Sequence, residues 1–236
     1  MTGSRAPYLG VWEPAGDTRA VALVLHGGRE DGVTPVRANQ LAVLRMRPFA
    51  GELRRVGREH GLAVARLRYL VRGWNGARRS PVHDVEWAVG QLAHRFPGAP
   101  VALVGHSMGG RAAVYAAGAE PVRTVVGLAP WIEPGDPVDQ LAGRRVLIVH
   151  GDADRTTSPA NSQDFAAAAN RVADEVGYVG LRGERHPMLR RPRLWHRLSA
   201  GFVLATLCAV PPAETVGGDA ANVLAKVFAG TARLVV

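Results

Sequence analysis

The sequence predicts an α/β fold, in which a mostly parallel central sheet of about seven strands is covered by helices on both faces. Short apolar runs recur along the chain without polar alternation, which is typical of strands buried on both faces. Helical patterns separate these runs, and this alternation favours a parallel sheet. The chain has 236 residues, of which 47% are hydrophobic, and this length fits one domain of the larger kind.

The strands are expected where valine, leucine and alanine form continuous runs. These runs are residues 21–28, 62–70, 101–107, 124–131, 146–152 and 176–183. Residues 8–14 fit a further strand at an edge of the sheet.

Proline and glycine mark the ends of the helices expected between the strands. One helix ends at Gly61 and another stops at Pro97, while Ser158 fits an N-cap with Pro159 at the first helical position. The expected helices are residues 37–60, 83–96, 109–120, 158–175 and 192–210.

The whole chain, residues 1–236, is interpreted as a single domain whose core covers about residues 8–210. The remaining tail, residues 211–236, has the pattern of a turn followed by an amphipathic helix. The sequence leaves the role of this tail open.

The positive charge of the chain is almost entirely arginine. The formal net charge is +9 at pH 7, and Lys226 is the only lysine. The arginines are dispersed and are not interleaved with aromatic residues that could stack on bases, so no nucleic-acid partner is expected. A solvated surface is the favoured interpretation, and an acidic substrate or a weak attraction to polyanions is the alternative.

The lone cysteine, Cys208, excludes an internal disulfide and suits a reducing compartment. The first residues have no apolar segment of the kind found in signal peptides. The longest apolar stretch, residues 201–210, is too short to span a bilayer. We therefore expect a cytoplasmic protein without a membrane partner, and its oligomeric state stays open.

One serine lies between glycines directly after an apolar run, in the segment ALVGHSMGGRAAV (residues 102–114). Residues 105–109 match G-x-S-x-G, the pattern of a nucleophile elbow, with Ser107 as the serine. A serine at this turn has a strained backbone and an exposed oxygen, and its neighbours must be small because strand and helix approach closely. The helix that follows directs its positive end at the site, which favours a developing negative charge.

With this elbow the chain resembles the α/β-hydrolase family, in its capless serine-esterase or dienelactone-hydrolase-like branch. The resemblance covers about residues 8–210 and implies the chain order nucleophile, acid, histidine, with Ser107 first. Residues 151–154 match the family's G-x-x-D pattern, which implies that Asp154 is the acid. Asp152 is the alternative acid, and we expect it to stabilise the loop instead.

The histidine that the resemblance requires is His186, because it follows the last expected strand in the loop GERHPML. The other histidines either lie at strand ends beside glycine, where we expect them to shape the site, or lie in helices and at their ends. The first group is His26, His106 and His150, and the second is His60, His83, His94 and His196. Weaker alternative acids, at a position used in some branches of the family, are Glu133 and Asp136.

An oxyanion site needs two backbone N–H donors. The first is expected from Met108, directly after the serine. The second is expected from the loop after the first long apolar run, where His26-Gly27-Gly28 resembles the family's H-G-x motif and implies Gly28 as the donor. Arg29 is the alternative donor if the loop is shifted by one residue.

The chain is expected to lack a cap, because only a short connection separates the run ending near Trp131 from the run beginning near Arg144. Family members with a lid insert a helical cap at that point, so the resemblance implies an open site. Arg29, Trp74 and Trp131 are the candidate substrate-binding residues, and core packing of the two tryptophans is the alternative.

The implied activity is that of a serine hydrolase that cleaves carboxylic esters of small molecules. The acyl-enzyme would form on Ser107, with His186 as base and Asp154 as acid, and no cofactor would be needed. A thioesterase, a peptidase or an acyltransferase would use the same machinery, and a non-catalytic ligand-binding member of the fold is a further alternative. The sequence contains no P-loop and no cluster with metal-ligand spacing, so no metal is expected.

Overall fold

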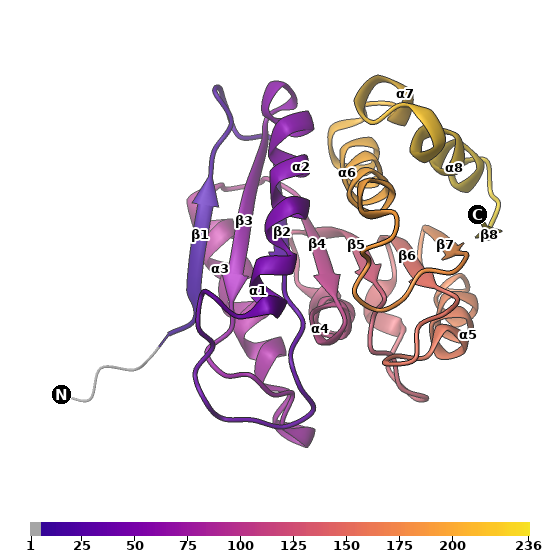
Figure 1. Cartoon of the computed structure of the whole chain (residues 1–236). Coiled ribbons are helices and arrows are strands. Elements are labelled where there is room, and N and C mark those ends of the chain that lie inside the picture. The colour runs from indigo at the N-terminus through magenta and orange to yellow at the C-terminus, as the bar shows by residue number, and fades with distance from the viewer. Residues whose placement is uncertain (1–5) are drawn as a thin grey trace.

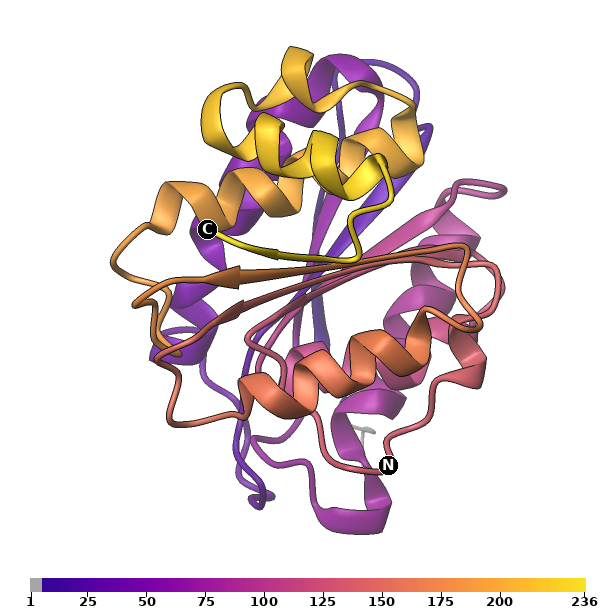
Figure 2. The same cartoon turned by 90° about the vertical axis from the view of Figure 1, so that its right-hand side faces the viewer.

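An eight-stranded sheet lies between two layers of helices in the structure, a computed structural model that describes residues 6–236 (Figures 1 and 2). The strand order across the sheet is β1-β3-β2-β4-β5-β6-β7-β8, and every pairing is parallel except that of β1 with β3. The strands are β1 (Tyr8–Trp12), β2 (Ala20–Leu25), β3 (Leu62–Arg68), β4 (Val101–His106), β5 (Val122–Leu128), β6 (Arg145–Gly151), β7 (Glu175–Leu181) and β8 (Arg233–Val235).

The central strands are buried on both faces, which explains their continuous apolar sequences. All residues of β2 and β4 are buried, and the two strands pair with Leu23 opposite Leu103. Successive side chains point to opposite faces, so Leu103 packs in one core cluster and Val104 in the other. The parallel arrangement brings the carboxyl ends of these strands to one edge of the sheet, where ligands of α/β proteins bind.

Three helices cover each face of the sheet, as the edge-on view shows (Figure 2). The helices on one face are α3 (Ser80–Arg95), α4 (Met108–Tyr115) and α5 (Pro159–Ala169), and those on the other are α2 (Arg47–Gly57), α6 (Pro192–Cys208) and α8 (Gly218–Phe228). Two short helices, α1 (Leu41–Arg45) and α7 (Pro212–Thr215), complete the set. This arrangement confirms the predicted fold class.

The single helix expected over residues 37–60 is instead two helices and a 3-10 turn. Helix α1 ends at Arg45, α2 begins at Arg47, and the turn covers Arg58–His60. Pro48 stands at the start of α2, where its missing N–H is tolerated. Inside a continuous helix the same proline would remove a backbone hydrogen bond and clash with the preceding turn.

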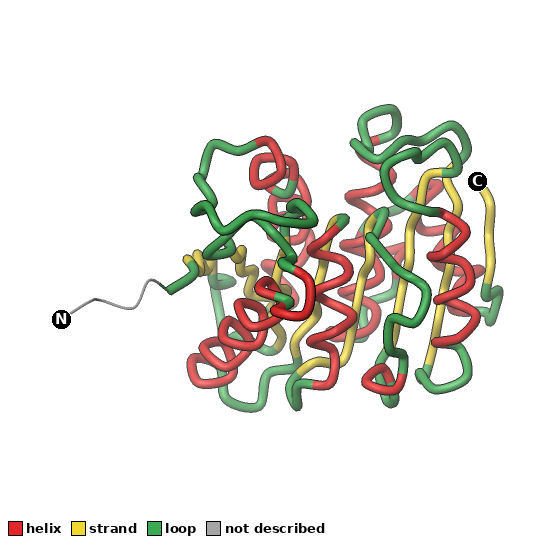
Figure 3. Tube along the Cα trace, turned by 90° about the horizontal axis from the view of Figure 1, so that it is seen from below, coloured by secondary structure: helices red, strands yellow, loops and turns green. Residues whose placement is uncertain are grey.

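The sheet has eight strands rather than about seven, because the C-terminal tail adds one. Helix α8 is the amphipathic helix expected there, and its Leu224 and Val227 are buried against the sheet and α6. The last residues then form β8 beside β7, with Leu234 opposite Val179. Figure 3 shows β8 at the edge of the sheet next to the C-terminus, opposite the edge nearest the N-terminus.

The connection between β5 and β6, residues 129–144, holds only one 3-10 turn, Asp139–Leu141. No cap is built on the carboxyl edge of the sheet at that point in the described chain. In residues 6–236, no helix combines the length and the apolarity that crossing a membrane requires.

Candidate active site

Ser107 occupies a sharp turn between β4 and α4. Its backbone has φ 55° and ψ −121°, a conformation that side-chain-bearing residues rarely adopt. A Cβ at Gly105 would collide with the Gly109 backbone, and one at Gly109 would lie 2.6 Å from the His26 carbonyl oxygen. Both glycines are therefore required by the close approach of strand, loop and helix around the serine.

Asp154 and His186 are joined by a short hydrogen bond at the same edge of the sheet. Asp154 follows β6 and His186 follows β7, and His186 Nδ1 lies 2.8 Å from Asp154 Oδ2. The Asp154 side chain is fully buried, whereas 13% of the His186 side chain is exposed. Asp152 points elsewhere, because its Oδ1 accepts from the Gly183 N–H at 2.6 Å. The structure thus pairs His186 with Asp154 and gives Asp152 a contact within the loop.

The Asp154 carboxylate accepts five hydrogen bonds. Oδ1 accepts from the backbone N–H groups of Thr156 (2.7 Å) and Thr157 (3.1 Å). Oδ2 accepts from the Thr157 hydroxyl (2.9 Å), from His150 Nε2 (3.2 Å) and from His186. Burial by itself raises the pKa of Asp154, but the hydrogen bonds from His150, His186 and the Thr156 N–H outweigh it and hold this pKa well below its usual range. Asp154 is therefore an ionised acceptor at neutral pH.

His106, directly before Ser107, contacts His186. His106 Nε2 donates to the His186 carbonyl oxygen at 3.1 Å, and the two rings lie 4.7 Å apart between centroids. Burial, and then the nearby His186, lower the pKa of His106 to about 3, so this ring is neutral. Within residues 6–236, Ser107 Oγ makes no hydrogen bond, and a base often closes on its nucleophile only when substrate is bound.

The loop after β2 is held rigidly beside Ser107. The Arg29 N–H donates to the Arg72 carbonyl oxygen at 3.0 Å, so it is committed to the neighbouring loop and is not available as an oxyanion donor. The Gly28 N–H makes no backbone hydrogen bond in the described chain, and Gly28 is exposed. A Cβ at Gly28 would lie 2.5 Å from the Arg72 carbonyl oxygen and would collide with the Met108 side chain. Only glycine fits this position.

His26 fixes the start of this loop. Its Nδ1 donates to the Gly27 carbonyl oxygen at 2.6 Å, and its Nε2 accepts from the Tyr69 N–H at 3.2 Å. Burial lowers the pKa of His26 to about 4, so the ring stays neutral and keeps both bonds. His26 therefore shapes the loop and does not carry a proton to the site.

A family model described as alpha/beta hydrolase fold matches residues 23–200. The chain belongs to the α/β-hydrolase fold family. No sequence among the curated proteins matches this chain.

Solved structures of capless and esterase members resemble this α/β-hydrolase. An α/β serine hydrolase without a lid, XC6422 from Xanthomonas campestris, is 18% identical with a TM-score of 0.60, covering 86% of this chain and 90% of its own. Est1E from Butyrivibrio proteoclasticus, with ferulic acid bound, is 16% identical with a TM-score of 0.60, covering 85% and 96%. The esterase Pf2001 from Pyrococcus furiosus is 15% identical with a TM-score of 0.63, covering 85% and 86%. At these identities the comparison shows a common fold.

The two tryptophans proposed as substrate-binding candidates pack around a partly buried arginine of this α/β-hydrolase. The Arg111 guanidinium lies 4.6 Å from the Trp74 ring centroid and 4.7 Å from that of Trp131. Trp74 is only 5% exposed and also packs edge-on against Tyr115, so the core-packing alternative describes it. Trp131 is half-buried, and its backbone N–H donates to the Ser107 carbonyl oxygen. Trp131 therefore stays a candidate, as does the exposed Arg29 side chain.

The alternative acids bond to other side chains and not to His186. Asp136 pairs with Arg111 at 2.7 Å and accepts from the Tyr115 hydroxyl at 2.7 Å. Glu133 accepts from the Trp131 indole N–H. Neither carboxylate bonds to a histidine. Across residues 6–236, no three His, Cys, Asp or Glu side chains are arranged to hold a metal ion.

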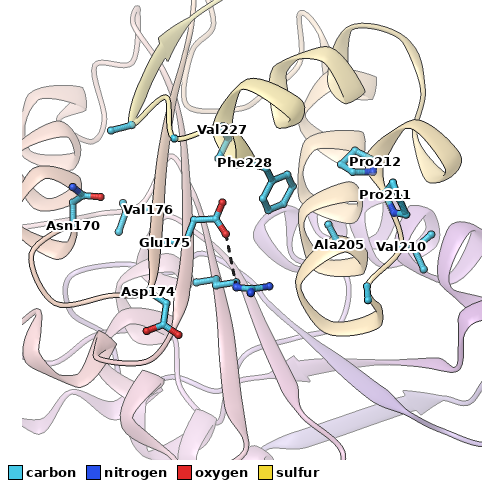
Figure 4. Close-up of a pocket in the computed structure, with 14 residues that line it drawn as sticks. Asn170, Asp174, Glu175, Val176, Ala205, Val210, Pro211, Pro212, Val227 and Phe228 are labelled. Atoms are coloured by element: carbon cyan, nitrogen blue, oxygen red, sulfur yellow. Dashed lines mark ion pairs between the residues drawn. The ribbon is translucent and has the colours of Figure 1, made fainter.

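A cavity of about 780 Å³ lies at the end of the sheet opposite the candidate active site, beside the amino-terminal ends of β6 and β7 (Figure 4). The ion pair between Arg145 and Glu175, at 3.8 Å, crosses it, and Phe228 of α8 and Pro211 line its apolar side. Ser107 and His186 follow the carboxyl ends of their strands, so this cavity is not part of the candidate active site.

The sequence did not predict two of the side chains that contact Asp154. His150 was expected to shape the site, but nothing predicted that it bonds to the acid itself. Thr157 was not considered, although its hydroxyl bonds to Asp154 and lies 3.2 Å from His186 Nδ1. The spacing of four residues between His150 and Asp154 across a strand end was the available signal.

Proposed function

We propose that this protein is a serine hydrolase that cleaves carboxylic esters through an acyl-enzyme on Ser107. The observation that carries the proposal is the 2.8 Å bond between Asp154 and His186 at the edge of the sheet where Ser107 occupies its strained turn. A base oriented by a buried acid beside an activated nucleophile is the arrangement used for acyl transfer.

In the proposed mechanism, Asp154 orients His186 through Nδ1, which leaves Nε2 free to accept a proton. Nε2 takes the Ser107 proton as the serine oxygen attacks the ester carbonyl. The resulting oxyanion is stabilised by the N–H groups of Met108 and Gly28. His186 then returns the proton to the leaving alcohol. It next takes a proton from the water molecule that attacks the acyl-enzyme and passes it to Ser107 Oγ as the carboxylic acid is released.

The proposed substrates are esters of small molecules. The short connection over residues 129–144 leaves the carboxyl edge uncovered, which suits ester bonds presented without a lid. The similar structures named above include an esterase, Pf2001, and a protein with ferulic acid bound, Est1E. Half-buried Trp131 and exposed Arg29 are the proposed contacts of the substrate.

The test is a series of p-nitrophenyl esters and matched thioesters of increasing acyl length, assayed with the wild type and with Ser107→Ala. We expect wild-type turnover, labelling by a fluorophosphonate probe, and a loss of about 10⁴-fold or more in kcat for the variant. If the wild type neither hydrolyses any member nor reacts with the probe, the proposal is wrong. Full activity of Ser107→Ala would refute the assignment of the nucleophile.

The acid is tested by a matched pair of substitutions in one loop. Asp154→Asn removes the acceptor of the His186 Nδ1–H and should lower kcat by about 10⁴-fold. Asp152→Asn keeps an oxygen for the Gly183 N–H and should stay within about tenfold of the wild type. A larger loss for Asp152→Asn than for Asp154→Asn would reverse the assignment.

A further inference from the structure

His150 is a fully buried histidine that the proposed mechanism does not use. It lies near the end of β6, between Ser162 of helix α5 and the acid. Its Nδ1 lies 2.9 Å from Ser162 Oγ, and its Nε2 lies 3.2 Å from Asp154 Oδ2. Its side chain has no exposed surface. A buried imidazole with both nitrogens engaged adopts one fixed arrangement of its protons.

The partners determine which nitrogen of His150 carries the proton. An ionised carboxylate only accepts hydrogen bonds, so the proton must lie on Nε2. In the tautomer with its proton on Nε2, Nδ1 has a lone pair that accepts from the Ser162 hydroxyl. His186 donates its own Nδ1–H to the same oxygen of Asp154. Two imidazoles, one from β6 and one from the loop after β7, therefore share a single carboxylate oxygen.

We propose that His150 is a positioning residue that sets the basicity of His186 by sharing Asp154 Oδ2 with it, and that Ser162 fixes the orientation of the His150 ring through Nδ1. The inference rests on the proposed role of His186 as the base. Each donor that binds a carboxylate stabilises its negative charge and weakens its attraction for a neighbouring imidazolium. Loss of the bond from His150 would therefore leave more of the Asp154 charge to hold a proton on His186, the group that must accept one as the base.

Other groups also face His186, and one of them, the Thr157 hydroxyl, lies 3.3 Å from His150 Nε2 as well. From β4, the neutral His106 ring faces His186, and its pKa is lowered mainly by burial and then by His186. From α1, the charge of Arg45 acts on His106 in the same direction. From the loop after β6, the Thr157 hydroxyl bonds to Asp154 and reaches His186 Nδ1. Because Thr157 also touches His150, the variant that keeps a donor to Asp154, His150→Gln, separates loss of that bond from a displaced Thr157.

Two conservative variants separate this bond from the rest of the ring. In His150→Asn the side-chain amide reaches the position of Nδ1, so it retains Ser162 and loses Asp154. In His150→Gln the amide reaches the position of Nε2, so it still donates to Asp154. We expect His150→Asn to raise the acid limb of the kcat/KM profile by about 0.5–1 pH unit, and His150→Gln to restore it to within about 0.2 unit.

The pKa of His186 is measured independently of activity by ¹⁵N NMR titration of the whole protein. It should rise by about the same 0.5–1 unit in His150→Asn, and by less in Ser162→Ala, where the His150 ring is no longer anchored through Nδ1. Equal shifts in the Asn and Gln variants, or an unshifted His186 in the Asn variant, overturn the inference. So does a wild-type His150 spectrum that places the proton on Nδ1, which decides the matter even where a variant does not fold. If the wild type hydrolyses no ester, the proposed function fails, while the titration still tests the sharing of Asp154.

Discussion

Replacing Gly28 with alanine tests whether the loop after β2 supplies an oxyanion donor. The added Cβ would lie 2.5 Å from the Arg72 carbonyl oxygen, a distance that real Cβ atoms do not adopt. The Arg72 oxygen is held in place because it accepts the Arg29 N–H at 3.0 Å. The Met108 side chain blocks the alternative direction. The Gly28 backbone must therefore move, and its N–H moves with it.

The size of this movement gives the expected loss of activity. The contact must lengthen by at least about 0.5 Å to become tolerable, which would stretch a hydrogen bond of about 2.9 Å to an oxyanion beyond the normal range. Losing one oxyanion donor costs about 10²–10³-fold in kcat, or about 3–4 kcal/mol of transition-state stabilisation. The ground-state carbonyl depends less on this donor, so KM should change by less than about threefold.

The assay compares kcat and KM on one p-nitrophenyl ester for the wild type, Gly28→Ala and Gly51→Ala. Gly51 lies on the exposed face of α2 with no atom near an added Cβ, so its variant controls for the substitution itself. The thermal midpoint of each variant shows whether the fold persists. A folded Gly28→Ala protein with kcat within tenfold of the wild type would refute the role of the Gly28 N–H.

Three further outcomes are expected. Burial lowers the pKa of His26 to about 4 and of His106 to about 3 from 6.5, so the unfolded chain binds protons first as pH falls. As pH is lowered from 6.5 to about 4, stability measured by urea unfolding should fall by about 1.4 kcal/mol per pH unit for each of these two histidines, and His106→Gln should remove one of the two contributions. Asp136→Ala leaves Arg111, 11% exposed, without its partner and should cost about 3–5 kcal/mol in the same assay; a loss under 1 kcal/mol would contradict this. Gly90→Ala, on the exposed face of α3 with open space around the new methyl group, should stabilise by about 0.5–1 kcal/mol, and a lower thermal midpoint would contradict it.

The buried strands could be predicted from the sequence because each one is marked by its own apolar run. A continuous apolar run such as residues 101–107 is explained by burial on both faces, and the run itself carries that information. Strand β8 was not predictable, because residues 233–235 form a strand only by pairing with β7, which lies far away in the sequence. The division between α1 and α2 was readable in principle from Pro48, since a proline is tolerated at the start of a helix and not in its interior.

The candidate site was also predictable only in part. The elbow around Ser107 and the loops of Asp154 and His186 follow strand ends, so chain order alone indicated them. The Arg29 N–H is occupied by a hydrogen bond to Arg72, more than forty residues away, and no local pattern encodes that contact. The packing of Trp74, a loop residue, against Arg111 of helix α4 is likewise a contact between segments distant in the sequence. Sequence patterns predict which groups reach an edge of a sheet, whereas the pairing between loops decides which of their atoms remain free.

The parallel ladder also explains how the strain at Ser107 is sustained. A positive φ at a residue other than glycine costs about 1–3 kcal/mol and persists only where its surroundings determine it. The residue after each of β4, β5 and β6 is bonded to a residue at or near the end of the next strand: Ser107 N–H to Leu128 O (3.1 Å), Ala129 N–H to Val149 O (2.8 Å) and Asp152 N–H to Leu181 O (3.1 Å). Ala129 also has a positive φ, of 41°. These bonds continue the sheet past the strand ends. If the backbone of one turn relaxed to a negative φ, its N–H would lose the hydrogen bond to the next strand. The sheet therefore holds the turns that carry Ser107 and Asp154 as one connected series.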